Sequence, residues 1–268
     1  MSPLDDLLSR LWDDYVRLNP HALKVRRLLE GRGERVVNDH IALRTFDDPR
    51  VNEQVLGRAF TKLGYEPRES YEFPAKKLLA RHYEHPQPGR PLVFISELRL
   101  GEMPNWLADV ARKLVDQVPT GLTDRWDFPV AGRPWKLDFA TYQKLADASE
   151  YAGWLAAHGF RANHFTVLVN ELKTFDSLAA LNVFLEGSGF ALNASGGKIK
   201  GTPAEYLEQS STLAQEVEVE FTDGKRVVPG CYYEFARRYP LPGASGELFR
   251  GFIAKSADKI FESTDRRR

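Results

Sequence analysis

Two histidines and one glutamate occupy comparable places in stretches that alternate between polar and apolar residues. His40 lies in VNDHIALRTF, His164 in ANHFTVLVN and Glu234 in CYYEFARR. Such alternation predicts half-buried strands, and it puts all three side chains on the face opposite the apolar one. Two imidazoles and one carboxylate from three strands form a facial triad with open coordination positions, typical of non-haem Fe(II). The pattern therefore predicts a mononuclear metal site with Fe²⁺ as its ion.

Each of these residues has a plainer interpretation when it is taken alone. A single inward histidine is more often a hydrogen-bonded core residue, and a buried glutamate usually pairs with an arginine or lysine. The metal site is favoured because three residues of the right types occupy matching places on similar strands.

Arg44 follows His40 by four residues, so in a strand it faces the same side. A guanidinium beside a metal can hold a carboxylate with two parallel hydrogen bonds, which would suit a 2-oxo acid that carries a second carboxylate. Arg238 shares the predicted face of Glu234 and is a second candidate for substrate binding. We expect Arg44 to be the catalytic-site arginine.

The order of elements around these residues repeats. Strand, helix and three strands are expected within 36–100, and a similar series within 162–238, where AQEVEVEFT (214–222) and RVVPGCYYEFARR (226–238) predict one hairpin across Asp223-Gly224. This predicts an α+β fold in which two βαβββ modules form a half-open barrel like that of the vicinal-oxygen-chelate architecture. The rest of a single domain, 1–268, is then made up of N-terminal helices (1–33), a helical connector (103–160) and a C-terminal cap (239–268).

That architecture raises the question of a fourth ligand. Glu97, in VFISEL, is expected at the position of the first module that corresponds to Glu234. Four protein ligands would resemble the zinc or nickel isomerases of the architecture. The other histidines, His21, His82, His85 and His158, are predicted to lie on the surface.

Composition excludes several classes of protein. Lys plus Arg and Asp plus Glu both total 37, so no net charge favours nucleic acid or an anionic membrane. The one cysteine, Cys231, rules out an internal disulfide and a cysteine-rich zinc site. The N-terminus lacks the pattern of a signal peptide and no long apolar run follows, so a cytoplasmic location is expected. Arg266-Arg267-Arg268 is predicted to be a solvated tail.

The stretches VNDHIALRTF, ANHFTVLVN, LEQSST and VPGCYYEFARR resemble signature segments of the 2-oxoadipate dioxygenase/decarboxylase family, and the resemblance spans most of the chain. It implies an Fe(II) held by His40, His164 and Glu234, and an Arg44 that contacts the substrate carboxylate. It also implies conversion of 2-oxoadipate and O₂ to 2-hydroxyglutarate and CO₂, late in lysine catabolism. The expected partners are thus a small 2-oxo acid and O₂.

Two other functions stay open at this point. Glu97 motivates a metal-dependent isomerase, lyase or hydrolase of the vicinal-oxygen-chelate type, which would show no dependence on O₂. A non-catalytic small-molecule binding protein could use the same concave barrel without a metal. The sequence leaves the particular 2-oxo acid and the oligomeric state undetermined.

Overall fold

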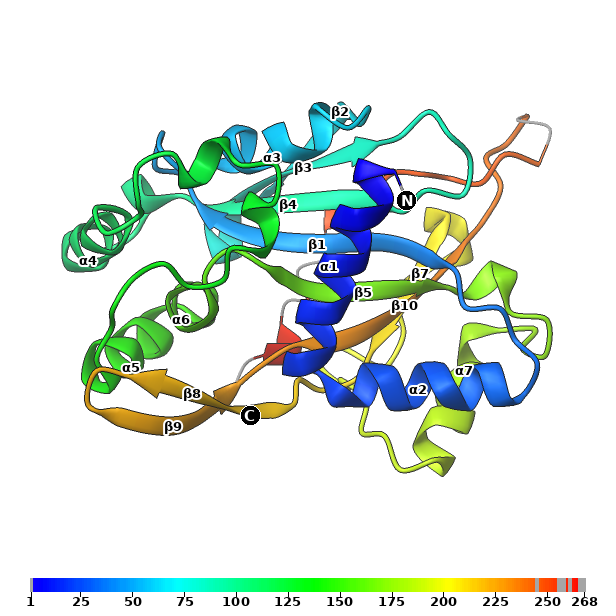
Figure 1. Ribbon diagram of the computed structural model, residues 1–268. Helices are drawn as coiled ribbons and strands as arrows, with labels where there is room; N and C mark the ends of the chain where they lie inside the picture. The colour runs from blue at the N-terminus through cyan, green and yellow to red at the C-terminus, as the bar shows by residue number, and fades with distance from the viewer. Residues whose placement is uncertain (1, 244–245, 255–258, 260–261, 265–268) are drawn as a thin grey trace.

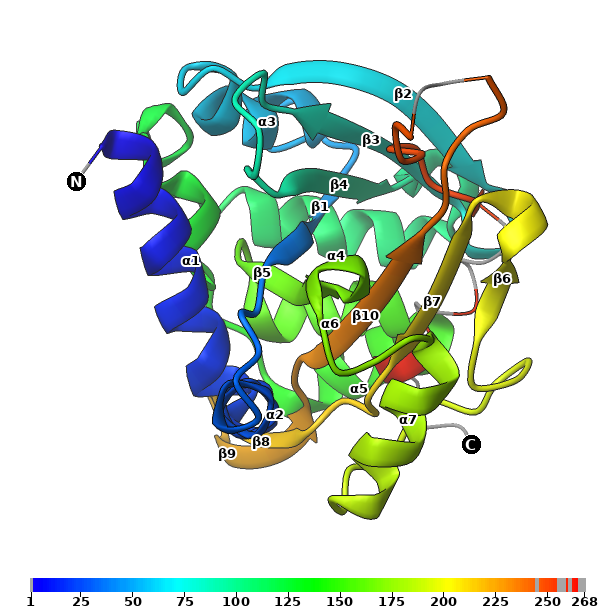
Figure 2. The same cartoon turned by 90° about the vertical axis from the view of Figure 1, so that its right-hand side faces the viewer.

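The computed structural model describes residues 2–243, 246–254, 259 and 262–264, which build one curved sheet with helices around it (Figure 1). The eight strands of the sheet run in the order β2-β3-β4-β1-β5-β10-β7-β6. Seen from the side, the sheet curls from β2 to β6 and encloses a concave face (Figure 2). The strands of the sheet are β1 Asn38–Phe46, β2 Glu66–Phe73, β3 Leu78–Glu84, β4 Leu92–Leu98, β5 Ala162–Leu168, β6 Lys200–Thr202, β7 Leu207–Ser211 and β10 Tyr232–Arg238.

The sheet consists of two similar halves that meet at their first strands. In the first half β1 pairs in parallel with β4, and in the second half β5 pairs in parallel with β10. β1 and β5 are antiparallel to each other, with Ile41 opposite Phe165. With α3 after β1 and α7 after β5, each half has the order βαβββ, which confirms the two modules predicted from the sequence.

Helices cover the convex face of the sheet. They are α1 Pro3–Leu18, α2 Pro20–Gly31, α3 Glu53–Thr61 and α7 Leu178–Gly187. The α1 helix begins at a capping box between Ser2 and Asp5, which satisfies backbone N–H groups of its first turn. Trp12 of α1 packs edge-on against Phe165 at 5.1 Å, and Tyr15 donates a hydrogen bond to the carbonyl of Tyr232. The outward side chains of β5 and β10 are therefore buried, which leaves their other face to the concave side.

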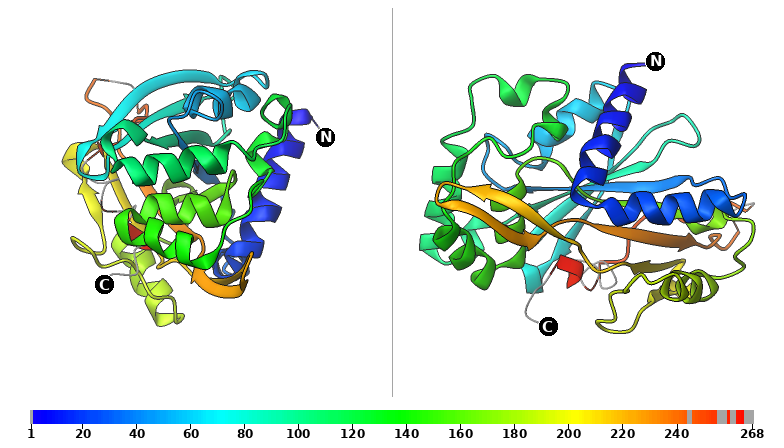
Figure 3. Two further views of the ribbon diagram at one scale, coloured as in Figure 1. Left: turned by 90° about the vertical axis from the view of Figure 1, so that its left-hand side faces the viewer. Right: turned by 60° about the horizontal axis from the view of Figure 1, so that its bottom comes forward.

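One end of the concave face is closed by the helices between the two modules (Figure 3). These helices are α4 Asn105–Val115, α5 Phe139–Ala148 and α6 Glu150–His158. Every residue of α6 from Tyr151 to His158 is buried, as expected for a helix that is apolar all round. The Tyr151 hydroxyl donates to the carbonyl of Ser96 in β4, and Trp154 Nε1 donates to the carbonyl of Gly230. Thus α6 ties both modules together at this end.

The predicted hairpin was wrong in its second strand. Glu216–Phe221 (β8) and Gly224–Pro229 (β9) form a separate two-stranded sheet, and Tyr232–Arg238 is an independent strand, β10, of the main sheet. Pro229 has no N–H to donate, and Gly230 and Cys231 lie between the two strands, so the ladder ends there. The glutamate of the predicted site consequently sits in the main sheet rather than on a projecting hairpin.

Two histidines predicted to lie on the surface are buried. His82 of β3 and His158 of α6 are each 2% exposed, because one faces the concave side of the sheet and the other ends a fully buried helix. The predicted C-terminal cap is described only in part, and the Arg266-Arg267-Arg268 tail lies outside the described residues. Within the described residues, no helix has both the length and the apolar composition that a bilayer crossing requires.

Candidate metal centre

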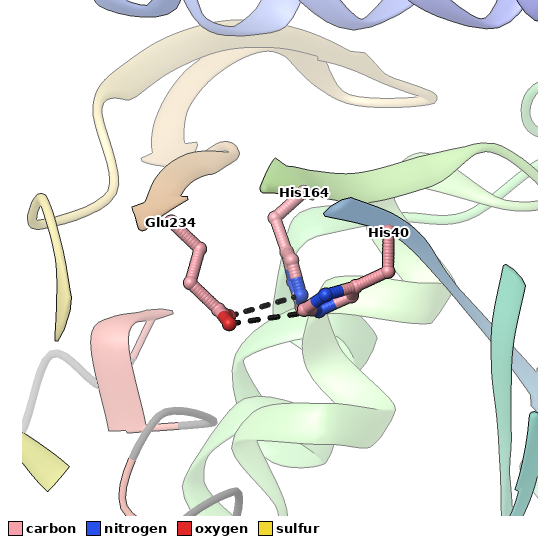
Figure 4. Close-up of side chains that lie close together, drawn as sticks. All are labelled: His40, His164 and Glu234. Carbon is pink, nitrogen blue, oxygen red and sulfur yellow. Dashed lines mark ion pairs between the residues drawn. The ribbon is translucent and has the colours of Figure 1, made fainter. Parts of the chain in front are cut away.

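His40, His164 and Glu234 converge on the concave face from three strands, β1, β5 and β10 (Figure 4). The Nε2 atom of His164 lies 3.2 Å from Glu234 Oε2, and Nε2 of His40 lies 3.5 Å from Glu234 Oε1. The two imidazole rings are 5.5 Å apart. One potential ligand atom from each residue lies within 4.8 Å of the others, so a single ion could contact all three. The sequence prediction that these residues meet is confirmed.

The protonation state of the cluster suits a cation. Burial is the main cause that holds the pKa of His164 well below its ordinary value, and the neighbouring His40 and Arg44 side chains add to it, so the ring of His164 is neutral and can donate a lone pair. Burial also raises the pKa of Glu234, although His40 and the Gln209 amide oppose this. Glu234 Oε2 accepts no hydrogen bond from the described residues. A buried carboxylate oxygen beside two imidazole nitrogens fits a metal ion better than it fits a hydrogen-bonded core.

Each histidine is oriented by the residue that precedes it. His40 Nδ1 lies 2.7 Å from Asp39 Oδ2, and His164 Nδ1 lies 3.1 Å from Asn163 Oδ1. An imidazole that donates its Nδ1–H in this way can present the lone pair of Nε2 to the cluster. Asp39 can reach its own neighbour because the β1–β5 register shifts between Asn38 and His40, as in a bulge.

Arg238 holds Asp39 from the other side. Its Nε and Nη2 donate to the two carboxylate oxygens of Asp39 at 2.6 and 2.8 Å, and Nη1 donates to the carbonyls of Phe249 and Gly251. Burial raises the pKa of Asp39, but the charge of Arg238 and the hydrogen bonds from His40 and Arg238 together outweigh burial and hold that pKa far below its ordinary value. The structure thus places Arg238 behind His40 as a positioning residue, and the substrate contact expected of it stays a prediction.

Glu97 does not reach the cluster, so the prediction of its place was wrong. His40 pairs with Leu92 and His164 with Tyr232, and two residues further along the last strand of each module are Phe94 and Glu234. Glu97 points to the convex face, where its Oε2 accepts from the backbone N–H of Glu53 at the start of α3. Among the described residues only three side chains therefore form the candidate ligand set.

Aromatic rings of the first module and of the C-terminal segment line this side of the site, where the fourth ligand was expected. Phe252 packs edge-on against His40 at 4.9 Å and lies 4.7 Å from Phe94. Tyr71 and His82 also contact Phe252, at 5.9 and 5.6 Å. These rings shield one side of the cluster from water, which strengthens electrostatic interactions inside it.

Comparison with known proteins gives the family. The model of the 2-oxoadipate dioxygenase/decarboxylase family matches residues 132–250. The chloroplastic 2-oxoadipate dioxygenase/decarboxylase of Arabidopsis thaliana is 34% identical over 291 residues, covering 96% of this chain and 76% of that protein. The chain belongs to the 2-oxoadipate dioxygenase/decarboxylase family. The resemblance found in the sequence is confirmed, and the chain is an enzyme of the decarboxylating dioxygenase kind.

Solved structures agree with this family and with the fold. Hydroxyglutarate synthase from Oryza sativa, crystallised with 2-oxoadipate, matches with a TM-score of 0.91 at 33% identity, over 97% of this chain and 91% of that one. A Shewanella frigidimarina protein, described in general terms as a hydrolase, matches with a TM-score of 0.88 at 48% identity, over 93% of this chain and 97% of that one. A glyoxalase superfamily protein from Ralstonia eutropha shares the fold, with a TM-score of 0.76 at 20% identity, over 92% of this chain and 84% of that one. The predicted α+β half-barrel of the vicinal-oxygen-chelate type is confirmed.

Arg44, which in this family is expected to face the substrate, lies fully buried at the end of the concave face closed by α6. Its guanidinium lies over the rings of Tyr151 and Trp154, at 4.8 and 5.1 Å. Nη1 donates to Glu150 Oε1 at 2.7 Å. Burial lowers the pKa of Arg44, but the charge and hydrogen bond of Glu150, together with Tyr232 and Tyr151, outweigh burial and raise that pKa. Its contact with substrate stays a prediction.

Tyr232 packs against a candidate ligand and interacts electrostatically with Arg44. Its ring stacks on His164 at 4.5 Å, and its hydroxyl is buried without a hydrogen-bond partner among the described residues. Burial and the negative charge of Glu234 raise its pKa well above the ordinary value, so the hydroxyl keeps its proton. It is a donor available to a bound acid.

Several residues around the candidate ligands were not predicted from the sequence. Asp39 and Asn163 could have been found, because an acid or amide precedes the histidine in both modules. Gln209, which donates to Glu234 Oε1 at 2.6 Å, lies in a segment noted only for its family resemblance. Glu150 and Phe252 come from the connector and the C-terminal segment, where no repeat pointed to them.

Proposed function

We propose that this chain is an Fe(II)-dependent enzyme that converts a 2-oxo acid of the 2-oxoadipate type and O₂ to a 2-hydroxy acid of the 2-hydroxyglutarate type and CO₂. The observation that carries the proposal is the convergence of two buried imidazoles and one buried carboxylate in a member of this family. The rice relative named hydroxyglutarate synthase, crystallised with 2-oxoadipate, supports the substrate class.

His40, His164 and Glu234 would hold the iron. Two histidines and one carboxylate leave coordination positions open, which suits non-haem Fe(II) better than a structural zinc site with four protein ligands. When bound, Fe(II) would supply Lewis-acid chemistry toward the 2-oxo acid and redox chemistry toward O₂. The substrate is thereby activated without a protein nucleophile.

The protein's own side chains would position the substrate and the ligands. Asp39 and Asn163 keep a proton on Nδ1 of each histidine, so that Nε2 stays a donor to the metal. Arg44 would receive the second carboxylate of the acid, and the Tyr232 hydroxyl, which has no partner among the described residues, would donate a hydrogen bond to the acid. Phe94 and Phe252 exclude water from the opposite side.

Anaerobic reconstitution followed by O₂ consumption tests the proposal. Protein loaded with Fe(II) should consume one O₂ and release one CO₂ for each molecule of 2-oxoadipate, and His40→Ala should consume none. A panel of 2-oxo acids of different length would then define the preferred substrate. The proposal fails if no acid in the panel supports O₂ uptake above the His40→Ala variant.

The isomerase or lyase alternative is less favoured, because Glu97 lies on the convex face and adds no fourth ligand. The binding-protein alternative predicts unchanged ligand affinity after His40→Ala. A cytoplasmic location and a place in lysine catabolism stay predictions from the sequence.

A further inference from the structure

Arg44 and Glu150 form an ion pair inside the protein. The Arg44 side chain has no exposed surface, and that of Glu150 is 11% exposed. Thr264 joins the two, because its hydroxyl accepts from Arg44 Nη2 at 3.4 Å and donates to the same Glu150 oxygen that Arg44 contacts. A buried guanidinium requires a negative partner, and here a side chain of the protein itself supplies it.

This pairing conflicts with a second carboxylate at Arg44. On the proposed function, the far end of a dicarboxylic 2-oxo acid would approach a guanidinium whose charge Glu150 already neutralises. Two carboxylates around one buried arginine leave an uncompensated negative charge, which a protein interior strongly disfavours. The incoming acid can therefore bind Arg44 well only if Glu150 moves away.

The structure provides a place to which Glu150 can move. A cleft of about 290 Å³ lies beside it, and Glu150 itself is part of the wall. The cleft is also lined by Lys76 and Lys77, which follow one another at the end of the short helix before β3. Lys76 Nζ already lies 3.9 Å from Glu262 Oε1, so the two lysines together bring one positive charge more than that glutamate needs, which would compensate a carboxylate that has left Arg44. Glu150 starts α6, so a change of its side-chain rotamer leaves the buried part of that helix in place.

We propose that Glu150 is a specificity-determining residue: it occupies Arg44 in the free enzyme and is exchanged for the terminal carboxylate of a dicarboxylic 2-oxo acid. This inference rests on the proposed function. A monocarboxylic acid of the same length brings no charge to replace that of Glu150, so it leaves the ion pair intact. Discrimination between the two acids thus depends on the exchange at Arg44.

The exchange is tested by calorimetry, which measures the affinities of two matched acids for the Fe(II)-loaded protein under anaerobic conditions. The acids are 2-oxoadipate and 2-oxohexanoate, which differ only in the terminal carboxylate. In Glu150→Gln, which keeps the shape but not the charge, 2-oxoadipate should bind at least tenfold more tightly than in the wild type, and 2-oxohexanoate within twofold. Glu30→Gln, in an exposed pair with Arg26, should change neither affinity. Glu150→Asp keeps the charge on a shorter side chain, so it should also tighten 2-oxoadipate binding, but by a smaller factor than Glu150→Gln. This variant replaces Glu150→Gln in the test if Glu150→Gln does not fold.

The lysines give an independent readout. Lys76→Met with Lys77→Met should weaken 2-oxoadipate binding severalfold in the wild type but not in Glu150→Gln, since only a displaced glutamate needs the lysines. Equal weakening in both backgrounds, or an unchanged ratio of the two acids' affinities in Glu150→Gln, would overturn the exchange.

Failure of the exchange and failure of the proposed function are distinguishable. If 2-oxohexanoate binds and His40→Ala abolishes that binding, the metal site accepts 2-oxo acids, and an unchanged ratio then counts against Glu150 alone. If neither acid binds, or if binding survives His40→Ala, the proposed function fails and the exchange fails with it.

Discussion

Asp39 and Asn163 occupy the same position in the two modules, and each accepts the Nδ1–H of the histidine that follows it, at 2.7 and 3.1 Å. The two residues differ in charge. Asp39 carries a full negative charge that Arg238 neutralises, whereas the amide of Asn163 needs no counter-ion. Removal of the charge on Asp39 should therefore affect both His40 and Arg238.

Asp39→Asn is expected to lower metal affinity by about tenfold to a hundredfold, because a neutral amide holds the imidazole less firmly. It also leaves the buried Arg238 unpaired, at a cost of about 3–5 kcal/mol in the free energy of unfolding. The double variant Asp39→Asn with Arg238→Gln should regain part of that stability but not the metal affinity. Chelator competition and urea unfolding measure the two quantities. Recovery of full metal affinity in the double variant would contradict the positioning role of Asp39.

Glu97 and Glu234 should respond differently to the same substitution. Glu97→Gln should leave metal stoichiometry at one ion and change the affinity by less than about twofold, since a Gln carbonyl can still accept from the N–H of Glu53. Glu234→Gln should abolish tight metal binding, because it removes the only carboxylate of the candidate ligand set in the described residues. Metal analysis of purified, Fe(II)-reconstituted variants decides this, and a loss of metal in Glu97→Gln would restore the four-ligand alternative.

The contrast between these two glutamates shows what a sequence pattern can and cannot predict. Alternation correctly placed His40, His164 and Glu234 on one face, because a strand repeats every two residues. The same alternation misplaced Glu97, which lies three residues beyond the true counterpart, because an odd offset along a strand puts a side chain on the other face. Only the ladder, which pairs His40 with Leu92, identifies Phe94 as the counterpart of Glu234. The ion pair of Arg44 with Glu150 could not be predicted, since it joins β1 to a helix of the connector.

Metal removal should destabilise the enzyme. An ion that binds only the folded state adds about 2.7 kcal/mol to the free energy of unfolding when its free concentration is a hundredfold above Kd. Chelation should therefore lower the Tm of the wild type, and re-addition of Fe(II) should restore it. Glu234→Gln should show no such response, yet its metal-free form should be at least as stable as the metal-free wild type, because a charge disfavoured by burial is gone. A lower Tm for metal-free Glu234→Gln than for the metal-free wild type would contradict this account.

Phe252 should control how readily the metal is lost. Its ring is 6% exposed and packs against His40 and Phe94, so Phe252→Ala opens a path for water to the site. If the segment cannot close the cavity, the substitution also lowers the free energy of unfolding by about 3–5 kcal/mol. We expect transfer of Fe(II) to a chelator to become at least tenfold faster. Phe252→Leu, which keeps an apolar cover, should stay within about threefold of the wild type. Equal rates for all three proteins would show that this ring does not shield the site.

His158 should make stability fall in mild acid. Burial lowers its pKa to about 3, although the hydrogen bond of Nε2–H to the carbonyl of Pro229 opposes the shift. In the unfolded chain a histidine has a pKa near 6.5, so below that pH it binds a proton that His158 does not bind in the folded chain. The stabilising contribution of His158 is therefore complete above about pH 6.5 and is lost as the pH falls from there toward 3. Between pH 7.5 and 5 the free energy of unfolding should fall by about 2 kcal/mol on this account.

In His158→Gln the amide can keep the hydrogen bond without titrating. The free energy of unfolding, measured with urea on metal-free protein, should therefore decline by about 2 kcal/mol less between pH 7.5 and 5 than in the wild type. Parallel declines in the two proteins would mean that His158 takes up its proton in the folded state.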